Sequence, residues 1–284
     1  MKRIALATYT AHPTLETNDG LLYDALAELG IKAEATAWND KNAEWSTFDA
    51  VVLRSCWDYH LHPAEFKNWI LYLKSKAIPL WNDPKLVIWN MHKSYLLDLG
   101  KDGVRTVPTI LLESPDDLNK LLEEKNLDEI VIKPAVGASG YKIVKTSMKD
   151  MRQQPEVIEK MLVADNVLVQ PFIKEASETG EFSSIYFNGV HSHTVLKQPK
   201  SGDFRSNYEH GAVASNVSPD RIILKKLQPV LDSIRPIPLY ARVDYLIQAG
   251  EPLLMELELI EPNLYLDLWP PSAKTFAELI INRV

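Results

Sequence analysis

The sequence predicts two fold classes in one chain: an α/β unit at the N-terminus, followed by a larger α+β body. Between Ile4 and Trp81, short apolar strands alternate with amphipathic helices. This order is typical of a parallel sheet with helices on both faces. From Glu129 onward, short strands of alternating polar and apolar residues follow one another with turn residues between them, as in antiparallel hairpins. A chain of 284 residues is long enough for one large domain or two to three small ones.

Four strands and two helices are expected in the N-terminal unit. In chain order they are the strand IALATY, the helix LLYDALAEL, the strands IKAEATAW and FDAVVLRS, the helix FKNWILYLKSK and the strand IPLW. The first helix should end at Gly30, because glycine is the preferred residue just after a helix. The arrangement is Rossmann-like, but the sequence lacks the glycine-rich dinucleotide fingerprint, so we expect no dinucleotide there.

The middle of the chain begins with a connection. Asn82-Asp83-Pro84 favours a turn, so the segment NDPKLVIWN should separate the first unit from the next. A helix over MHKSYLLDL, a strand over TVPTILL and a helix from Ser114 to Lys125 should follow.

The body should be dominated by strands. The expected strands are EIVIKP, YKIVKT, VLVQPFI, EFSSIYFNG, VHSHTVLKQ, ARVDYLIQ and PLLMELELI, with helices at roughly 155–163 and 219–233 and a closing helix FAELIINRV. Asn188-Gly189 between two of these strands is a strong hairpin signal.

Composition and charge exclude several classes of protein. A net charge of -7 argues against general nucleic-acid binding, which depends on a basic face. One cysteine, Cys56, excludes an intrachain disulfide and fits a reducing compartment. No run approaches the roughly 20 apolar residues of a membrane span. We therefore expect a cytoplasmic protein that binds neither nucleic acid nor a membrane.

Two of the expected strands, ARVDYLIQ and PLLMELELI, form an acidic hairpin whose register follows from parity. An even-numbered turn would set Asp244 opposite Met255 and mix polar with apolar faces. An odd turn, such as Ala249-Gly250-Glu251, sorts both faces. It pairs Asp244 with Glu256, Arg242 with Glu258, Val243 with Leu257 and Tyr245 with Met255. We therefore expect the odd register.

The odd register brings three carboxylates together, those of Asp244, Glu256 and Glu258. Like charges directly opposite one another destabilise a sheet unless a cation is present. Mg²⁺ prefers one or two carboxylates together with substrate phosphates. The other interpretation is a solvated strand face on which Arg242 pairs with the acids, and the hairpin by itself leaves both open.

A lysine and a small-residue loop follow the strand EIVIKP. Lys133 ends this strand, and Ala135-Val136-Gly137-Ala138-Ser139-Gly140 comes next. Small residues let backbone N–H groups approach phosphate oxygens, and a neighbouring lysine adds a positive charge. An ordinary hairpin loop is the alternative, since neither a Walker A nor a GxGxxG pattern is present.

The order of several short motifs resembles the ATP-grasp superfamily over about residues 85 to 265. These motifs are a helical Lys93, VIKP with its loop, QPFI, DFRSN, RVD and ELE. The stretch from Gln170 to Gly211 is especially similar to bacterial glutathione synthetase and the ribosomal-protein glutamate ligases. The resemblance implies an ATP-grasp fold with an N-terminal Rossmann-like substrate domain at 1–82, central and small lobes at 83–172 and a C-terminal catalytic lobe at 173–284.

The resemblance also implies roles for individual residues. Lys93 and Lys133 match the lysines that contact ATP phosphates, and Gly137, Ser139 and Gly140 match the loop over the triphosphate. Gln170, Phe172 and Ile173 match the adenine-binding strand, and Glu181 matches the acid near the ribose, with Glu175 and Glu178 as competitors. Lys197, Arg205 and Asn207 match the groups facing the phosphates and the acyl phosphate, and Asp244, Glu256 and Glu258 match the magnesium ligands. Arg205, Lys133 and Arg242 are the expected catalytic residues. Glu258 departs from the family, which more often has asparagine there.

A substrate site is expected where the third strand of the N-terminal unit ends, in LRSCWDYHLHP. Ligands of open α/β sheets bind at the carboxyl ends of the strands. Arg54 could hold a substrate carboxylate and Asp58 an amino group, with Trp57 beside them. The alternative is a structural Arg–Asp pair with Trp57 packed beneath it.

Four segments extend the resemblance to a particular branch of the superfamily over nearly the full chain. RSxWDY, WNMHK, GDFRSN and ELELIEPNLYL look like the ATP-grasp enzyme of D-cycloserine biosynthesis and its relatives. This resemblance implies closure of O-ureido-D-serine to a five-membered ring through an acyl phosphate.

The expected function is therefore an ATP- and Mg²⁺-dependent carboxylate–amine ligase acting on a small amino-acid-like substrate. A dipeptide or glutathione-like ligase, which needs a second amine substrate, and a nucleotide-binding protein without turnover are the alternatives. A homodimer is one option for its assembly, because dimers are common among relatives.

Overall fold

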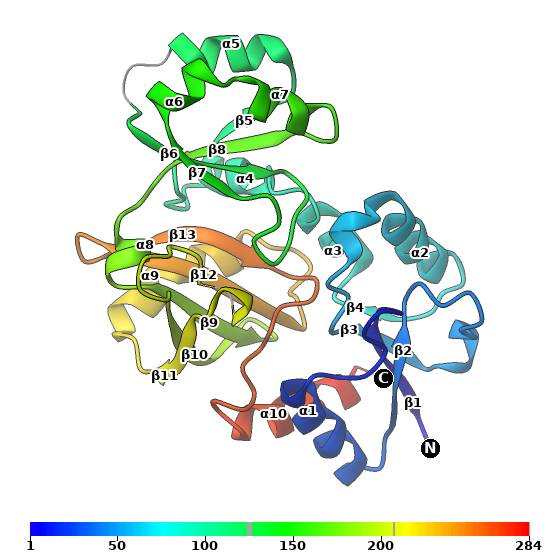
Figure 1. Cartoon of the computed structure of the whole chain (residues 1–284). Coiled ribbons are helices and arrows are strands. Elements are labelled where there is room, and N and C mark those ends of the chain that lie inside the picture. The colour runs from blue at the N-terminus through cyan, green and yellow to red at the C-terminus, as the bar shows by residue number, and fades with distance from the viewer. Residues whose placement is uncertain (124–126, 207, 284) are drawn as a thin grey trace.

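The structure of the protein is a computed structural model that describes residues 1–123, 127–206 and 208–283. Three β-sheets, each accompanied by helices, make up these residues (Figure 1). One sheet is parallel and comes from the N-terminal unit, and the other two are antiparallel and come from the rest of the chain. The division into an α/β unit and an α+β body is confirmed.

The N-terminal sheet has the strand order β2-β1-β3-β4. Its strands are β1 (Arg3–Thr8), β2 (Lys32–Ala37), β3 (Ala50–Leu53) and β4 (Leu80–Trp81), with helices α1 (Thr17–Glu28) and α2 (Pro63–Ser75) between them. Every residue of β3 is buried, as expected for a central strand covered on both faces. Gly30 follows α1 with φ +76°, a left-handed conformation that glycine adopts without strain.

The segment expected to be a plain connection is in fact a helix. Helix α3 (Pro84–Asn90) begins with Asp83, whose side chain accepts a hydrogen bond of 2.8 Å from the backbone N–H of Lys85. Pro84 at the first helical position needs no N–H partner, so the turn signal marked a helix start. The next helix, α4 (Tyr95–Lys101), starts later than predicted. Lys93 therefore lies in the turn between α3 and α4, and the prediction that it sits on a helix is wrong.

The second sheet has the order β5-β8-β6-β7. Its strands are β5 (Ile110–Leu112), β6 (Glu129–Pro134), β7 (Val144–Ser147) and β8 (Val167–Pro171). Helices α5 (Pro115–Glu123), α6 (Met148–Gln153) and α7 (Glu156–Leu162) lie together on one side of it (Figure 1). The predicted end of the first of these helices, at Lys125, lies outside the described residues, and α6 was not predicted.

The third sheet has the order β11-β10-β9-β12-β13. Its strands are β9 (Glu181–Phe187), β10 (Val190–Gln198), β11 (Val213–Val217), β12 (Tyr240–Gln248) and β13 (Glu251–Glu258), and the short α8 (Glu175–Glu178) and α9 (Arg221–Asp232) accompany it. Asn188 and Gly189 have φ of 50° and 79° and form the predicted hairpin turn. Strand β11 was not predicted, because three of its five residues are polar or small and the alternation is weak.

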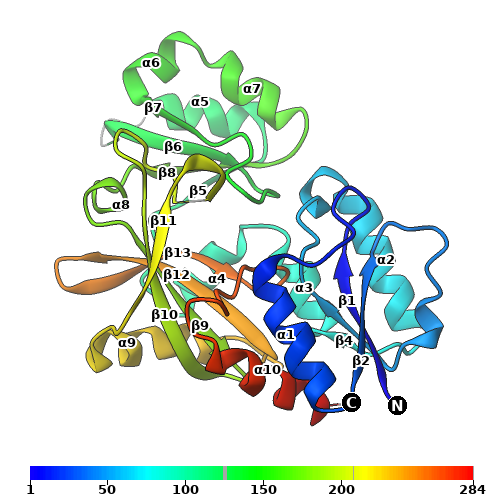
Figure 2. The same cartoon turned by 60° about the horizontal axis from the view of Figure 1, so that its bottom comes forward.

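The closing helix α10 (Pro271–Ile281) returns to the N-terminal unit and lies beside α1 (Figures 1 and 2). Phe276 of α10 is fully buried in one core that also contains Leu22 of α1 and Tyr240 of β12. The two ends of the chain are thus packed around the same core.

Each of the ranges 1–82, 83–172 and 173–284 contains one of the three sheets. The exact domain boundaries remain a prediction. In the described parts of the chain, no helix is both long and apolar enough to cross a membrane.

Candidate active site

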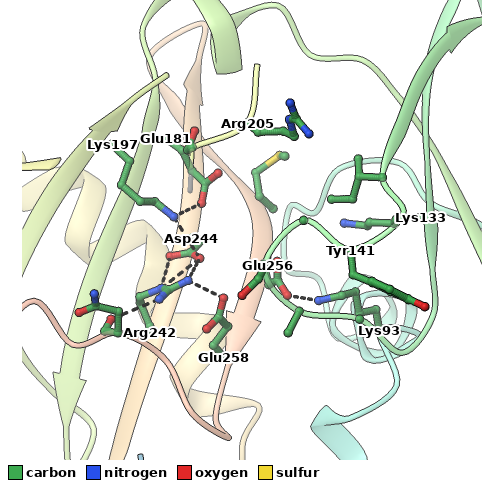
Figure 3. A pocket seen from close by; sticks show the side chains of 18 of the residues that line it. Lys93, Lys133, Tyr141, Glu181, Lys197, Arg205, Arg242, Asp244, Glu256 and Glu258 are labelled. Carbon is green, nitrogen blue, oxygen red and sulfur yellow. Dashed lines mark hydrogen bonds and ion pairs between the residues drawn. The ribbon is translucent and has the colours of Figure 1, made fainter. Parts of the chain in front are cut away.

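A cavity of about 650 Å³ lies where the three sheets meet. Its walls come from the loop after β6, from β8, from the ends of β12 and β13, and from the loop after β3 in the N-terminal unit. Parts of the chain that are far apart in sequence therefore share one site (Figure 3).

The acidic hairpin forms one wall, and its register at the site is the predicted one. Asp244 lies opposite Glu256, Val243 opposite Leu257 and Arg242 opposite Glu258. The expected pairing of Tyr245 with Met255 is wrong, because Tyr245 lies opposite Leu254 and the register shifts after Asp244. The turn contains only Ala249 and Gly250, with φ of 53° and 77°. The odd register therefore comes from a β-bulge in β13, where one residue has no partner on β12.

Asp244 is the most enclosed carboxylate of the site, at 1% exposure. It accepts hydrogen bonds from the Arg242 guanidinium, at 2.8 Å from Nη2, and from the Ser183 hydroxyl at 2.5 Å. The Lys197 ammonium lies 3.5 Å away. Burial opposes its ionisation, but Arg242 and Lys197 hold the pKa of Asp244 below its usual value.

Glu256 and Glu258 face the cavity more openly and pair with different cations. Glu256 binds the Lys93 ammonium, and Glu258 binds the Arg242 guanidinium (Figure 3). Burial raises the pKa of Glu258, Arg242 lowers it, and the neighbouring carboxylates of Glu256 and Asp244 raise it further. Together they raise the pKa of Glu258 to about 8. An additional cation at this wall would therefore be stabilising.

Lys133 is the cavity cation that stays unmatched. Among the described residues its ammonium has no hydrogen-bond or ion-pair partner, although the side chain is only 7% exposed. Burial lowers the pKa of Lys133 to about 8. Glu256 and Glu181 offset this effect only in part. A buried cation without an ion-pair partner is the arrangement expected of a site that receives an anion.

The small-residue loop lies beside this lysine. Gly137, Ser139 and Gly140 all line the cavity. Ser139 and Gly140 have φ of 50° and 72°, so the backbone turns in the left-handed region at two successive positions. Such turns expose consecutive N–H groups, which is the geometry that binds phosphate oxygens.

The residues assigned to adenine lie at the far end of the cavity, on and after β8. Gln170 is buried and donates a hydrogen bond of 2.8 Å to the Thr109 hydroxyl. Phe172 and Ile173 also line the cavity, and the Phe172 ring packs edge-on against Phe204 with centroids 5.8 Å apart. Apolar side chains therefore line this part of the cavity.

Two further charged pairs complete this half of the cavity. Glu181 accepts a hydrogen bond of 2.6 Å from Lys197, and both residues line the cavity. Arg205 also lines the cavity, but it is partly exposed and its guanidinium is engaged with Asp203 at 2.7 Å. The remaining residue expected to contact phosphate, Asn207, lies outside the described residues.

The predicted substrate residues separate into two groups. Trp57 lines the cavity, whereas Arg54 and Asp58 do not. Arg54 is 2% exposed and donates to Asp19 at 2.8 Å and to the backbone oxygen of Pro262 at 2.9 Å. Arg54 thus forms a structural ion pair, and its partner is Asp19 and not Asp58.

Asp58 has partners of its own. It accepts hydrogen bonds from the Trp38 indole at 2.7 Å and the Asn39 amide at 3.0 Å. The structure brings neither Arg54 nor Asp58 to the cavity wall, because hydrogen-bond partners within the protein hold both side chains.

Several cavity residues were not predicted. Tyr141 follows the small-residue loop, Tyr59 lies just after the predicted substrate residues, and Glu261 follows the acidic hairpin. Glu261 had one available signal, a third acidic residue three positions after Glu258 and directly before a proline. Its place depends on how the chain leaves β13, which alternation along a strand does not reveal.

Two lobes that enclose buried lysines, a small-residue loop and a carboxylate-bearing hairpin define an ATP-grasp enzyme. Comparison with known families supports this class. Residues 90–258 match the RimK-like ATP-grasp domain, and residues 4–82 match the N-terminal domain of D-cycloserine synthetase DcsG. The chain belongs to the RimK-like ATP-grasp family and is an ATP-dependent ligase that joins a carboxylate to an amine.

Individual relatives agree with this assignment. The chain is 27% identical to the cycloserine biosynthesis protein DcsG of Streptomyces lavendulae, over 99% of this chain and 98% of the relative. It superimposes on the crystal structure of D-cycloserine synthetase DcsG with a TM-score of 0.89 at 26% identity, covering 99% of both chains. A ribosomal protein bS6–L-glutamate ligase of Escherichia coli O7:K1 is 30% identical over 56% of this chain and 52% of its own length.

Proposed function

We propose that the protein closes an amino-acid-like substrate into a ring by activating its carboxylate with ATP, as in D-cycloserine formation. The observation that carries the proposal is that one cavity contains both the nucleotide-type residues and a wall from the N-terminal unit. Lys93, Lys133, the 137–140 loop and Trp57 all line this cavity. The N-terminal wall belongs to the part of the chain that matches D-cycloserine synthetase DcsG, which supports a similar small substrate.

The side chains of the cavity fit transfer of a phosphoryl group to a carboxylate. Lys133 would hold phosphate oxygens with the backbone N–H groups of the 137–140 loop, and Lys93 would do so when it leaves Glu256. Arg205 and Arg242 would neutralise charge on the phosphorylated carboxylate. The amine then attacks the acyl carbon, its nitrogen loses a proton, and phosphate leaves with the electrons of the C–O bond. These steps need no cysteine or serine nucleophile.

Magnesium is also part of the proposal. No three described His, Cys, Asp or Glu side chains form a group that could hold a metal ion, and the predicted ligands are paired with cations. Glu256 and Glu258 fit the ion, since both offer oxygen atoms to the cavity and each has one cation partner to exchange. Asp244 fits only if Arg242 and Lys197 release it. When bound, magnesium would neutralise phosphate charge during transfer.

Location and assembly are also part of the proposal. We propose a cytoplasmic location, in line with the single cysteine. A homodimer stays a proposal for the assembly state, and the net charge of -7 supports a protein that does not bind nucleic acid.

The decisive experiment measures ADP formation with Mg²⁺-ATP and a panel of amino acids that includes O-ureido-D-serine. Ring closure predicts ADP formation with O-ureido-D-serine alone and a product without a second amine. Strict dependence on an added amine would instead establish a dipeptide-type ligase. Absence of ADP formation across the whole panel would favour a nucleotide-binding protein without turnover.

A further inference from the structure

Glu261 is a buried carboxylate of the cavity wall that the proposed phosphoryl transfer does not use. It is 7% exposed and lines the cavity, yet within the described residues its carboxylate has no hydrogen-bond or ion-pair partner. Buried carboxylates without partners are rare, because removing a charge from water is costly unless a counter-charge replaces the water.

The neighbouring cations do not supply that counter-charge. Three of them act electrostatically on Glu261, and each already pairs with another carboxylate. Arg242 pairs with Asp244 and Glu258, Lys93 pairs with Glu256, and Arg54 pairs with Asp19. Burial accordingly raises the pKa of Glu261 to about 7, and the three cations only partly offset it. The cavity therefore contains an unmatched anion as well as the unmatched cation Lys133.

The backbone around Glu261 is held by side chains of the N-terminal unit and of β12. The Trp57 indole donates to the backbone oxygen of Glu261 at 3.2 Å, and Arg54 donates to that of the next residue, Pro262, at 2.9 Å. The Tyr240 hydroxyl donates to the oxygen of Ile260, the preceding residue, at 2.7 Å. Three consecutive carbonyl groups are thus held, so the side chain is presented from a rigid support.

Aromatic rings border the same place. Trp57 and Tyr59 both line the cavity, and burial together with the charge of Glu261 raises the pKa of the Tyr59 hydroxyl well above its usual value. A carboxylate beside aromatic rings is a favourable environment for an ammonium group, which gains an ion pair and contacts with ring faces. No described lysine or arginine pairs with Glu261, so the ammonium group of a ligand would find an unpaired carboxylate there.

We propose that Glu261, with Trp57 and Tyr59, forms the subsite that binds the α-ammonium group of an amino-acid substrate. This inference deepens the proposed function, on which it rests for the identity of the substrate. The ammonium group would neutralise Glu261, and the substrate carboxylate would extend toward Lys133 and Arg242. The unmatched anion and the unmatched cation would then orient one zwitterionic molecule along the cavity.

Binding without turnover tests the inference. Isothermal titration calorimetry without ATP compares O-ureido-D-serine, D-serine and D-alanine with 3-hydroxypropanoate and propanoate, which are D-serine and D-alanine without the amino group. The wild type should bind at least one amino acid about 10- to 100-fold more tightly than the analogue without its amine. Glu261→Gln should reduce this preference to less than about threefold, and Glu261→Asp should retain part of it. Glu28→Gln, an exposed site on α1, is the matched control and should keep the full preference.

Three results would overturn the inference. They are binding of none of these amino acids by the wild type, an undiminished preference for the amino acid in Glu261→Gln, and a loss in Glu261→Gln that affects Mg²⁺-ATP binding instead. A thermal melt of Glu261→Gln that matches the wild type excludes misfolding as the cause. A wild type that shows the amine preference but forms no ADP would contradict the proposed function and leave the subsite supported.

Discussion

Asp244 of β12 lies directly opposite Glu256 of β13, and a bulge within β13 makes this pairing compatible with a two-residue turn. Without the bulge, the even turn would set Asp244 opposite residue 255 and would send Glu256 and Glu258 to the apolar face. The site therefore depends on a bulge that leaves one residue of β13, Met255, without a partner on β12. The same parity could have come from a three-residue turn, which is the solution that alternation suggests first.

Deleting Met255 should remove the bulge without changing the pairs, because Leu254 is then followed directly by Glu256 and the two-residue turn still sets Asp244 opposite Glu256. Deleting Leu254 and Met255 together should shift the register by one residue and turn Glu256 and Glu258 toward the core. Buried, unpaired carboxylates would cost more than about 4 kcal/mol, so we expect the double deletion to give an unfolded or aggregated protein and the single deletion, its matched control, a folded one. Thermal unfolding and ADP formation check the pair. Equal defects in both variants would contradict the role of the register.

Lys133 should make ATP affinity depend on pH. Its pKa in the free protein is about 8, so the ammonium is present below pH 8 and is lost as the pH rises above it. A bound triphosphate favours the charged form, and ATP binding should therefore weaken by up to about tenfold per pH unit above pH 8.

Lys133→Arg is the control for this pH dependence, because guanidinium stays charged throughout the range. Equilibrium ATP binding between pH 7 and pH 10 should give a falling affinity for the wild type and a flatter curve for the variant. Parallel curves would show that another group titrates.

Glu256→Gln should abolish turnover without abolishing ATP binding. The substitution removes one of the two open carboxylates and leaves the Lys93 ammonium without its partner. We expect the rate of ADP formation to fall at least about 100-fold. Glu251→Gln on the same strand is a suitable control, since Glu251 is exposed and pairs with Lys226 outside the cavity. Comparable rates for Glu256→Gln and the wild type would remove Glu256 from the catalytic site.

Arg54→Met should destabilise the fold and not the substrate complex. The variant leaves Asp19 as an uncompensated buried charge, which costs about 3–5 kcal/mol. Replacing Asp19 by leucine in the same protein should recover most of the lost stability, because no charge then remains unpaired. Denaturant unfolding measures both variants. If the double variant folds but has lost binding of the amino-acid substrate, Arg54 is a substrate residue after all.

Much of the site followed from patterns along the chain. The register that joins Asp244 to Glu256 follows from the strict alternation of polar and apolar residues in two strands. Lys133 and the 137–140 loop stand out because a lysine at a strand end precedes a run of small residues. These are local properties, and they predicted which side chains share a face of the sheet.

Local patterns were less informative where helices start. Helix α3 carries an Asp-Pro start that also reads as a turn, and only the burial of Leu86 and Val87 against neighbouring elements favours the helix. Lys93 lies in the turn after it for the same reason. Its ammonium still reaches Glu256, because the turn brings it to the cavity.

By itself, the sequence determined most of the strands and helices, the face on which the acidic residues lie and the class of chemistry that they support. The tertiary structure decided the partner of each charge. Arg54 binds Asp19 and not Asp58, Lys93 binds Glu256, and Glu261 remains unmatched. Ion pairing depends on distances of a few ångströms between segments far apart in the chain, and periodicity within one segment contains no information about those distances.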